Sequence, residues 1–238
     1  MKPFDKLRDL GRSLRGNAEG DSSMPEYFKA YLKKIEHQQS LATPTSEVEF
    51  IVLDTETTGA NPGKDRVVSF AAIRVCNNEI DIQSAVDWKV RAHLPSSNSS
   101  IEIHGVLNTE LEDGYSEARF VKELVNYVGA AVIIAFRPGF DMAMLNAVVK
   151  EQTGSKLINR TLDVYDLGMR IDYPIKPTFV NPEPYRLDKM CERYDIEQPD
   201  RHTAMGDAFA TAILFLKQLG RLEAQGVKTL KELMRRYG

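Results

Sequence analysis

The chain has 238 residues, of which 42% are hydrophobic and 27% are charged, and its formal net charge is -3. These are ordinary values for a soluble globular protein, and a chain of this length can bury a sizeable core in one large domain. The small negative charge argues against a protein that coats duplex nucleic acid through bulk positive charge, but it is compatible with a local basic patch.

The composition also argues against export and membrane insertion. Cys76 and Cys191 lie far apart in apolar segments and lack the spacing of metal ligands, so we expect reduced core residues and no disulfide. The longest apolar run, from Val128 to Phe136, is too short to span a bilayer. The charged N-terminal residues lack the apolar stretch of a signal peptide. We therefore expect a cytoplasmic protein that does not enter a membrane.

Residues 1–45 differ in pattern from the rest and are predicted to form a helical appendage and linker, followed by one domain over residues 46–238. A passage rich in Ser, Thr and Pro at 38–46 predicts the linker. Apolar side chains at helical spacing predict a helix from about Pro25: Tyr27, Phe28, Tyr31, Leu32 and Ile35. We expect its apolar stripe to pack on the body or on a second copy of the chain, in preference to a membrane surface.

The next part of the chain is predicted to form a mixed sheet. Three β-rich runs separated by short turns predict an antiparallel meander, at residues 48–53, 66–75 and 80–90. Apolar periodicity then predicts a helix, a strand, a helix and a last strand, at 116–128, 131–136, 141–152 and 160–164. The order strand, helix, strand implies a right-handed crossover and parallel pairing.

The C-terminal third is predicted to be mainly helical, with helices at 186–194, 203–219 and 228–237. Prolines between residues 174 and 184 predict an irregular loop before them. One α/β domain with helices flanking a mixed sheet results. Basic residues near the C-terminus favour a solvated helix face over a phosphate-binding surface: Lys217, Arg221, Lys228, Lys231, Arg235 and Arg236.

Two acids end the first predicted strand. Asp54 and Glu56 are spaced i, i+2, which on a strand sends both side chains to the same face. The carboxyl end of a strand is where open α/β sheets bind ligands. Two carboxylates so close repel each other unless a cation neutralises them. The alternative is that Asp54 caps a turn and Glu56 is solvated.

Two further acids follow later in the chain. Asp141 starts a helix just after the strand at 131–136, beside the first strand if the two pair in parallel, although helix capping explains it equally well. Asp207 lies in an otherwise apolar helix and needs a partner there. Four converging carboxylates can hold two divalent cations such as Mg²⁺, a pairing that promotes phosphodiester cleavage.

His202 precedes Asp207 by five residues, at a predicted boundary between loop and helix. An imidazole there can accept a proton from an attacking water, although a lone histidine is more often structural. The segment Thr57-Thr58-Gly59 follows the first strand, where hydroxyls, backbone amides and a glycine permit close approach of a terminal nucleotide. A plain turn explains this segment equally well.

Taken in order, three segments resemble the DEDDh 3′-to-5′ exonucleases, the family that includes the proofreading epsilon subunit of bacterial replicative polymerase. They are Asp54 to Gly59, Phe140-Asp141 and His202 to Asp207. The segments Ile103 to Val106 and Leu187 to Cys191 are similar to two further elements of the family. The likeness covers about residues 47–219.

This resemblance implies a ribonuclease H-like fold with a five-stranded mixed sheet, and a reaction with two Mg²⁺ or Mn²⁺ ions. It implies that Asp54, Glu56 and Asp207 hold the first ion, and that Asp54 and Asp141 serve the second. It makes His202 the general base that releases nucleoside 5′-monophosphates from DNA 3′ ends.

The resemblance also implies a pocket for the terminal nucleotide, lined by Thr57, Thr58, Gly59, His104 and Phe140. The chain departs from the family where many relatives carry His-Asn and it has Phe136 and Arg137. Arg137 could bind a phosphate of the penultimate nucleotide. Phe136 could stack on a base or merely end the buried strand.

The expected partners are single-stranded or frayed 3′ ends of DNA and, by resemblance, DNA polymerase subunits. An exoribonuclease that trims RNA is an alternative, because the same metal site cleaves either backbone. A catalytically silent scaffold bound to a polymerase is a second alternative. The complete acid set argues against the scaffold, because buried like charges without an ion would destabilise the fold.

Overall fold

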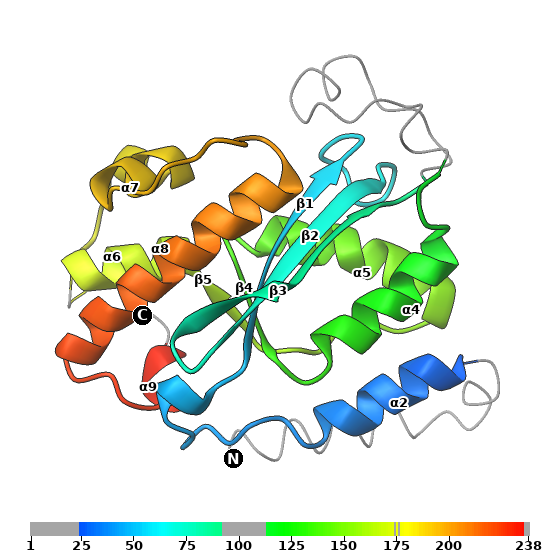
Figure 1. The fold of residues 1–238 in the computed structure, drawn as a ribbon, viewed down its shortest axis with the longest axis horizontal. Helices are drawn as coiled ribbons and strands as arrows, with labels where there is room; N and C mark the ends of the chain where they lie inside the picture. Colours follow the sequence, from blue (N-terminus) through cyan, green and yellow to red (C-terminus); the bar gives the residue numbers. More distant parts are fainter. Residues whose placement is uncertain (1–23, 92–112, 174, 176, 236–238) are drawn as a thin grey trace.

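A computed structural model describes residues 24–91, 113–173, 175 and 177–235. Its centre is a five-stranded sheet with the order β3-β2-β1-β4-β5 (Figure 1). The strands are β1 Phe50–Thr57, β2 Val67–Cys76, β3 Glu79–Lys89, β4 Val132–Ala135 and β5 Thr161–Asp163. The main helices are α2 Glu26–Ile35, α4 Glu117–Val128, α5 Gly139–Thr153, α6 Val164–Asp172, α7 Leu187–Arg193, α8 Ala204–Ala224 and α9 Leu230–Leu233.

The predicted mixed sheet is confirmed. β1, β2 and β3 form the antiparallel meander, whereas β4 pairs in parallel with β1 and with β5. β4 pairs only with Phe50 to Val52 of β1. The last residues of β1 therefore extend beyond β4, and the first turn of α5 lies beside them.

Alternation along β1 divides the core into two layers. Phe50 and Val52 pack in a cluster with α6, α7 and α8, whereas Ile51 and Leu53 pack with α2, α4 and α5 on the opposite face. All four side chains are buried. Because the strand continues this alternation, its even-numbered residues beyond position 53 face α8.

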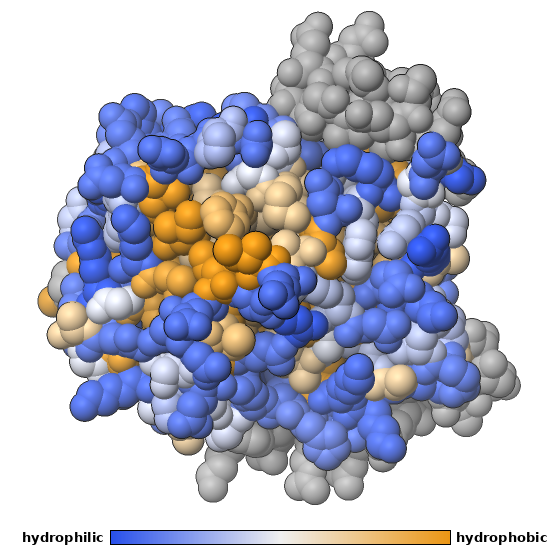
Figure 2. All heavy atoms as spheres, viewed as in Figure 1, coloured by the Kyte–Doolittle hydropathy of each residue, from blue (hydrophilic) through white to orange (hydrophobic). Residues whose placement is uncertain are grey.

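α8 is apolar around most of its surface. It packs on β1 and β2, and Figure 2 shows hydrophobic side chains gathered over the helix on the visible face. The predicted end at Leu219 was wrong, because the helix continues through Gly220 to Ala224 and buries Leu222. It stops where Gly226 takes a φ of 94° and the backbone N–H of Val227 bonds to Leu222.

α6 was not predicted, because the sequence indicated an irregular loop between the last strand and the next helix. Asp163 caps α6 by accepting a hydrogen bond from the backbone N–H of Tyr165 at 2.9 Å. Gly168 lies within the helix and lowers its intrinsic propensity. A Cβ there would lie 2.9 Å from the sulfur of Met190, so the glycine permits close packing against α7.

The C-terminal helix is shorter than predicted. α9 covers only Leu230–Leu233 and begins with a capping box between Thr229 and Glu232. Residues 236–238, the end of the predicted segment, lie outside the described residues.

The N-terminal helix packs on the body, as one of the two expectations stated. Phe28 and Tyr31 of α2 are buried. The Tyr31 hydroxyl donates to Asn159 at 2.7 Å and accepts from the backbone N–H of Ile158 at 2.8 Å. The expected linker is also held in place, since Thr45 is buried and donates to a carboxylate of α8.

Both cysteines are free in the described structure. Cys191 is buried, as predicted, whereas Cys76 was expected in the core and is only partly buried. Among the described residues, no helix combines the length and apolarity needed to cross a membrane.

Candidate active site

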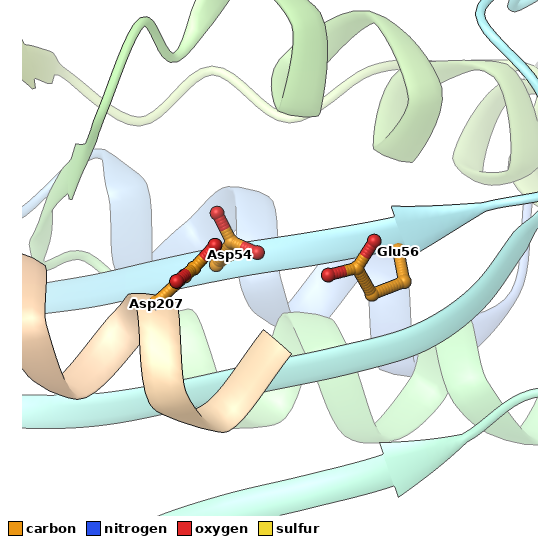
Figure 3. A group of neighbouring side chains, drawn as sticks. All are labelled: Asp54, Glu56 and Asp207. Carbon is orange, nitrogen blue, oxygen red and sulfur yellow. The ribbon is translucent and has the colours of Figure 1, made fainter. Parts of the chain in front are cut away.

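Three carboxylates meet between the end of β1 and the start of α8. Asp54 and Glu56 project from the α8 face of β1, and Asp207 projects toward them from the first turn of α8 (Figure 3). Each offers an oxygen, and these oxygens all lie within 4.8 Å of one another. The pairing of Asp54 with Glu56 on one face follows from the strand period, as the sequence predicted.

The local structure of α8 places Asp207. The Thr203 hydroxyl accepts a hydrogen bond from the backbone N–H of Gly206 at 3.0 Å, and its carbonyl accepts from that of Asp207 at 3.0 Å. Thr203 is therefore the N-cap of the helix. The cap fixes the carboxylate of Asp207 in the first turn, facing the sheet.

Asp141 reaches the same end of the sheet from α5. It is buried and accepts a hydrogen bond from the Thr55 hydroxyl at 2.7 Å. Thr55 lies between Asp54 and Glu56 but points to the opposite face of β1. Asp141 stands beside the group of three rather than within it, and its charge raises the pKa of Asp54.

The electrostatics of the cluster call for positive charge. Burial, followed by the charges of Asp141, Asp207 and Glu56, raises the pKa of Asp54 well above its usual value. Burial and the charges of Asp207 and Asp141 raise the pKa of Glu56 to about 7. Burial raises the pKa of Asp141 to about 6, against the effect of its hydrogen bond from Thr55. Such shifts concentrate at functional sites.

The donor set fits a hard divalent cation. Carboxylate oxygens are the ligands that Mg²⁺ and Mn²⁺ prefer. Oδ1 of Asp207 is buried and has no hydrogen-bond partner among the described residues. A buried carboxylate oxygen without a partner is costly, and a cation would supply the missing interaction.

Two cations border the cluster. Arg201 pairs with Oδ2 of Asp207, and its charge lowers the pKa of both Asp54 and Glu56. Lys89 of β3 donates to the Ser69 hydroxyl at 3.0 Å and also lowers the pKa of Glu56. Neither cation was singled out from the sequence.

His202 lies on the exposed turn between Arg201 and Thr203, with a φ of 66°. Its ring does not belong to the group of potential metal ligands found among the described residues. His202 directly follows Arg201, which contacts Asp207, but its own side chain is exposed to solvent. Its role as a base remains a prediction.

The hydroxyls of the segment after β1 are engaged within its own turn. Thr57 donates to the carbonyl of Gly59 at 2.8 Å, and Thr58 donates to Asp65 at 3.2 Å. A Cβ on Gly59 would lie 2.7 Å from the carboxylate of Asp65. The glycine is required by this turn, which supports the structural alternative.

The turn after β4 has a fixed geometry. Arg137 has a φ of 56°, and its backbone N–H donates to Asp163 at 2.9 Å. Its exposed guanidinium lies 4.4 Å from the centroid of the Tyr165 ring. Phe136 is partly buried and packs edge-on against Tyr165, which supports the interpretation that it ends the strand.

The remaining predicted substrate residues differ in their surroundings. Phe140 is 40% exposed in the first turn of α5, next to Asp141. His104 lies outside the described residues. Sequence reasoning missed Thr55 and Arg201, and the only signal for either was its position beside an acid or a histidine already selected.

The carboxyl edge of the mixed five-stranded sheet gathers acids from β1, α5 and α8. A family model described as Exonuclease matches residues 51–215, which include all four acids and His202. The chain therefore belongs to this exonuclease family, within the DEDD superfamily that its motifs resemble.

Similar proteins include bacterial DNA polymerase III proteins. The chain is 31% identical over 193 residues to the PolC-type DNA polymerase III of Bacillus subtilis, covering 81% of this chain and 13% of that protein. It is 32% identical over 191 residues to a DNA polymerase III subunit epsilon-like protein of Rhodobacter capsulatus, covering 79% of this chain and 26% of that protein. The match thus spans only a minor part of these longer relatives.

The fold is shared with E. coli exonuclease I. The structure of that enzyme in complex with a dT13 oligonucleotide matches with a TM-score of 0.64 and 22% identity, covering 76% of this chain and 43% of that one. At this level of identity the likeness supports the fold alone. The predicted ribonuclease H-like architecture is confirmed.

Proposed function

We propose that this chain is a 3′-to-5′ exonuclease that releases nucleoside 5′-monophosphates from single-stranded or frayed 3′ ends of DNA. The observation that carries the proposal is the group formed by Asp54, Glu56 and Asp207, whose oxygens lie within 4.8 Å of one another. Membership of the exonuclease family supports hydrolysis of phosphodiesters, and the family depends on divalent metal ions.

In this proposal the four carboxylates of the site bind two different cations. Asp54, Glu56 and Asp207 would hold one divalent cation, and Asp141 with Asp54 would serve a second. Two such ions, when bound, stabilise charge on the attacking and leaving oxygens of a phosphoryl transfer. The Thr55 hydroxyl keeps Asp141 in one orientation by its hydrogen bond of 2.7 Å.

His202 acts as the general base. Its exposed position lets an unprotonated ring nitrogen accept a proton from the water that attacks the terminal phosphodiester. The oxygen of that water bonds to phosphorus, and the bond from phosphorus to the 3′ oxygen breaks. The 3′ oxygen of the shortened strand takes a proton from solvent to become a hydroxyl, and His202 returns its proton to solvent. The released nucleotide carries the 5′-phosphate.

Residues outside the acid cluster bind the strand. The Arg137 guanidinium lies 4.4 Å from the centroid of the Tyr165 ring, and in this proposal it would bind a phosphate of the penultimate nucleotide. The exposed ring of Phe140 offers a surface on which a base can stack. Thr57, Thr58 and Gly59 shape the neighbouring turn, whose backbone would face the terminal nucleotide.

The relatives suggest a partner. The chain resembles parts of DNA polymerase III proteins, and exonuclease I was solved with single-stranded DNA. We therefore infer that a DNA 3′ end is the substrate and that a replicative polymerase is the candidate partner in the cell.

Labelled oligonucleotides test both the activity and its direction. Digestion from the 3′ end of a 5′-labelled DNA strand should give a ladder of shortening products, whereas a 3′-labelled strand should give labelled mononucleotide at once. Both should require Mg²⁺ or Mn²⁺. A strand with a blocked 3′ end is the control, and it should persist.

A matched pair of variants locates the activity. Asp207→Asn should abolish digestion, and Asp188→Asn, at an exposed carboxylate of α7, should leave it unchanged. An inert wild-type protein on DNA and RNA with either ion would refute the proposal. A strong preference for an RNA strand of the same sequence would replace DNA by RNA as the substrate.

A further inference from the structure

A cation already lies against the carboxylate cluster, and it belongs to the chain. Arg201 pairs with Oδ2 of Asp207. The side chain of Arg201 is 26% exposed and that of Asp207 is 11% exposed, so the pair is largely withdrawn from solvent. The same guanidinium lowers the pKa of Asp54 and Glu56. One side chain therefore offsets part of the negative charge of three carboxylates.

The loop before α8 is built to hold this arginine. The carbonyl of Asp200 accepts hydrogen bonds from the backbone N–H of Thr203 at 3.2 Å and from its hydroxyl at 2.8 Å. A Cβ on Gly206 would lie 1.9 Å from that carbonyl oxygen. Only glycine lets the loop lie so close to the first turn of α8, and the backbone of Arg201 is thereby fixed beside the helix.

The guanidinium and a divalent cation compete for one carboxylate. A cation bound to Oδ2 of Asp207 would stand against the positive charge of Arg201 at contact distance, which is unfavourable. Oδ1 of the same carboxylate is buried and has no hydrogen-bond partner among the described residues. A cation could therefore contact Oδ1 first, without displacing an existing hydrogen bond. Four carboxylates balance two divalent ions, and the guanidinium then becomes a surplus positive charge.

We propose that Arg201 is the internal counter-ion of the metal-free site and that it leaves Asp207 when divalent cations bind. This inference rests on the metal site of the proposed function. Arg201 is a positioning residue in this role: it holds the carboxylates together without metal and sets the cation concentration at which metal enters. Its removal should weaken the metal-free fold and strengthen metal binding. A residue that only stabilised the loop would lower stability without raising metal affinity.

The test compares wild-type protein with Arg201→Gln and with a control, Arg186→Gln. Arg186 is 60% exposed and pairs with acids outside the cluster. Thermal melting in EDTA should show a loss of about 2–4 °C for Arg201→Gln, the effect of a single ion pair in a domain of this size. Titration calorimetry with Mn²⁺, with every protein at the same pH of about 8, should show a Kd lowered about tenfold. Arg186→Gln should match wild type in the Mn²⁺ titration.

Several outcomes would overturn the inference. A Kd for Mn²⁺ that is unchanged or higher in Arg201→Gln would do so, whatever the melting temperature. If this variant does not fold in EDTA, Arg201→Lys replaces it, because an ammonium keeps the charge but not the planar fork. Its Kd should fall about two- to threefold, and an unchanged value would refute the exchange. Absence of Mn²⁺ binding in every protein, wild type included, would refute the metal site as well, whereas binding with equal Kd would refute only the role of Arg201.

Discussion

The charged residues at the two ends of α8 differ in whether the rest of the fold supplies them with partners. At the N-terminal end, Asp207 is buried with one oxygen unpartnered among the described residues and two other carboxylates within 4.8 Å. At the C-terminal end, Lys217 donates to the backbone carbonyl of Tyr194 at 2.6 Å. The Arg221 guanidinium lies 4.2 Å from the centroid of the Tyr194 ring. The basic residues are satisfied by contacts within the fold, whereas the acids carry more negative charge than the neighbouring Arg201 and Lys89 balance. The comparison separates charges that are paired within the fold from charges for which we propose a bound cation.

Asp163 shows that a shifted pKa is not enough to mark the site. Burial raises its pKa to about 6, as it does for Asp141. Oδ1 of Asp163, however, accepts hydrogen bonds from the backbone N–H groups of Arg137 and Tyr165, each at 2.9 Å. Its oxygen is occupied, and it serves the turn and the start of α6. Among the described carboxylates, Asp207 is distinguished by a buried oxygen that has no hydrogen-bond partner.

The sharpest way to break this comparison is to remove a charge at the acid end. Asp54→Asn should lower exonuclease activity about a thousandfold, because an amide cannot balance the cations that stabilise transition-state charge. The same change should raise the melting temperature in EDTA by about 2–4 °C, because it relieves repulsion among buried acids. Rates on labelled DNA and melting curves check both. A variant that is both inactive and less stable in EDTA would contradict the interpretation of the cluster as unbalanced.

A smaller effect is expected from the hydrogen bond that orients Asp141. Thr55→Val removes the hydroxyl but keeps the shape, and activity should fall about 10–100-fold, as for other groups that orient metal ligands. Thr55→Ser keeps the donor and is the matched control. Steady-state kinetics across Mg²⁺ concentrations should show that Thr55→Val needs more Mg²⁺ than wild type to reach half-maximal activity. Thr55→Ser should need the same concentration as wild type. Equal rates for Thr55→Val and wild type would remove the positioning role.

The pH dependence of metal-free stability should follow the raised pKa of Glu56. Its pKa rises from 4.5 unfolded to about 7 folded, so the folded protein binds more protons between these values and loses stability as pH rises through them. Glu56→Gln cannot lose that proton. The melting temperature of Glu56→Gln in EDTA should therefore gain on wild type from about pH 4.5 to pH 7. With saturating Mn²⁺ the wild type should regain the difference, and a constant gap in EDTA would show that Glu56 is not perturbed.

The smallest effect is expected at the opposite end of α8. Lys217→Met keeps the apolar stem and removes one hydrogen bond, which should cost about 1 kcal/mol of unfolding free energy. Activity and affinity for single-stranded DNA should stay unchanged across salt concentrations. Denaturant melts and binding titrations provide the measurements. A reduced salt dependence of DNA binding would instead favour the phosphate-contact alternative for the basic C-terminal residues.

Periodicity predicted most of the fold because the signals are local. The alternation in β1 predicts the common face of Asp54 and Glu56, and the three antiparallel strands follow from runs bounded by turns. α6 was missed because Gly168 weakens its helical signal, and that glycine exists for a contact with Met190 on another helix. The predicted helix ended at Leu219, just before Gly220, whereas burial of Leu222 carries α8 on to Ala224.

The acids of the candidate site were predictable from sequence, because a carboxylate at a strand end or inside an apolar helix is costly without a partner. Family membership was also predictable, because the motifs occur in the order that the family shows. The partners of those acids were not predictable: the Thr55 hydroxyl reaches Asp141 across 86 residues, and Arg201 reaches Asp207 only because a loop is pressed onto Gly206. Residue type and spacing determine which charges must be neutralised, whereas the packing of distant elements decides which groups come close enough to do so.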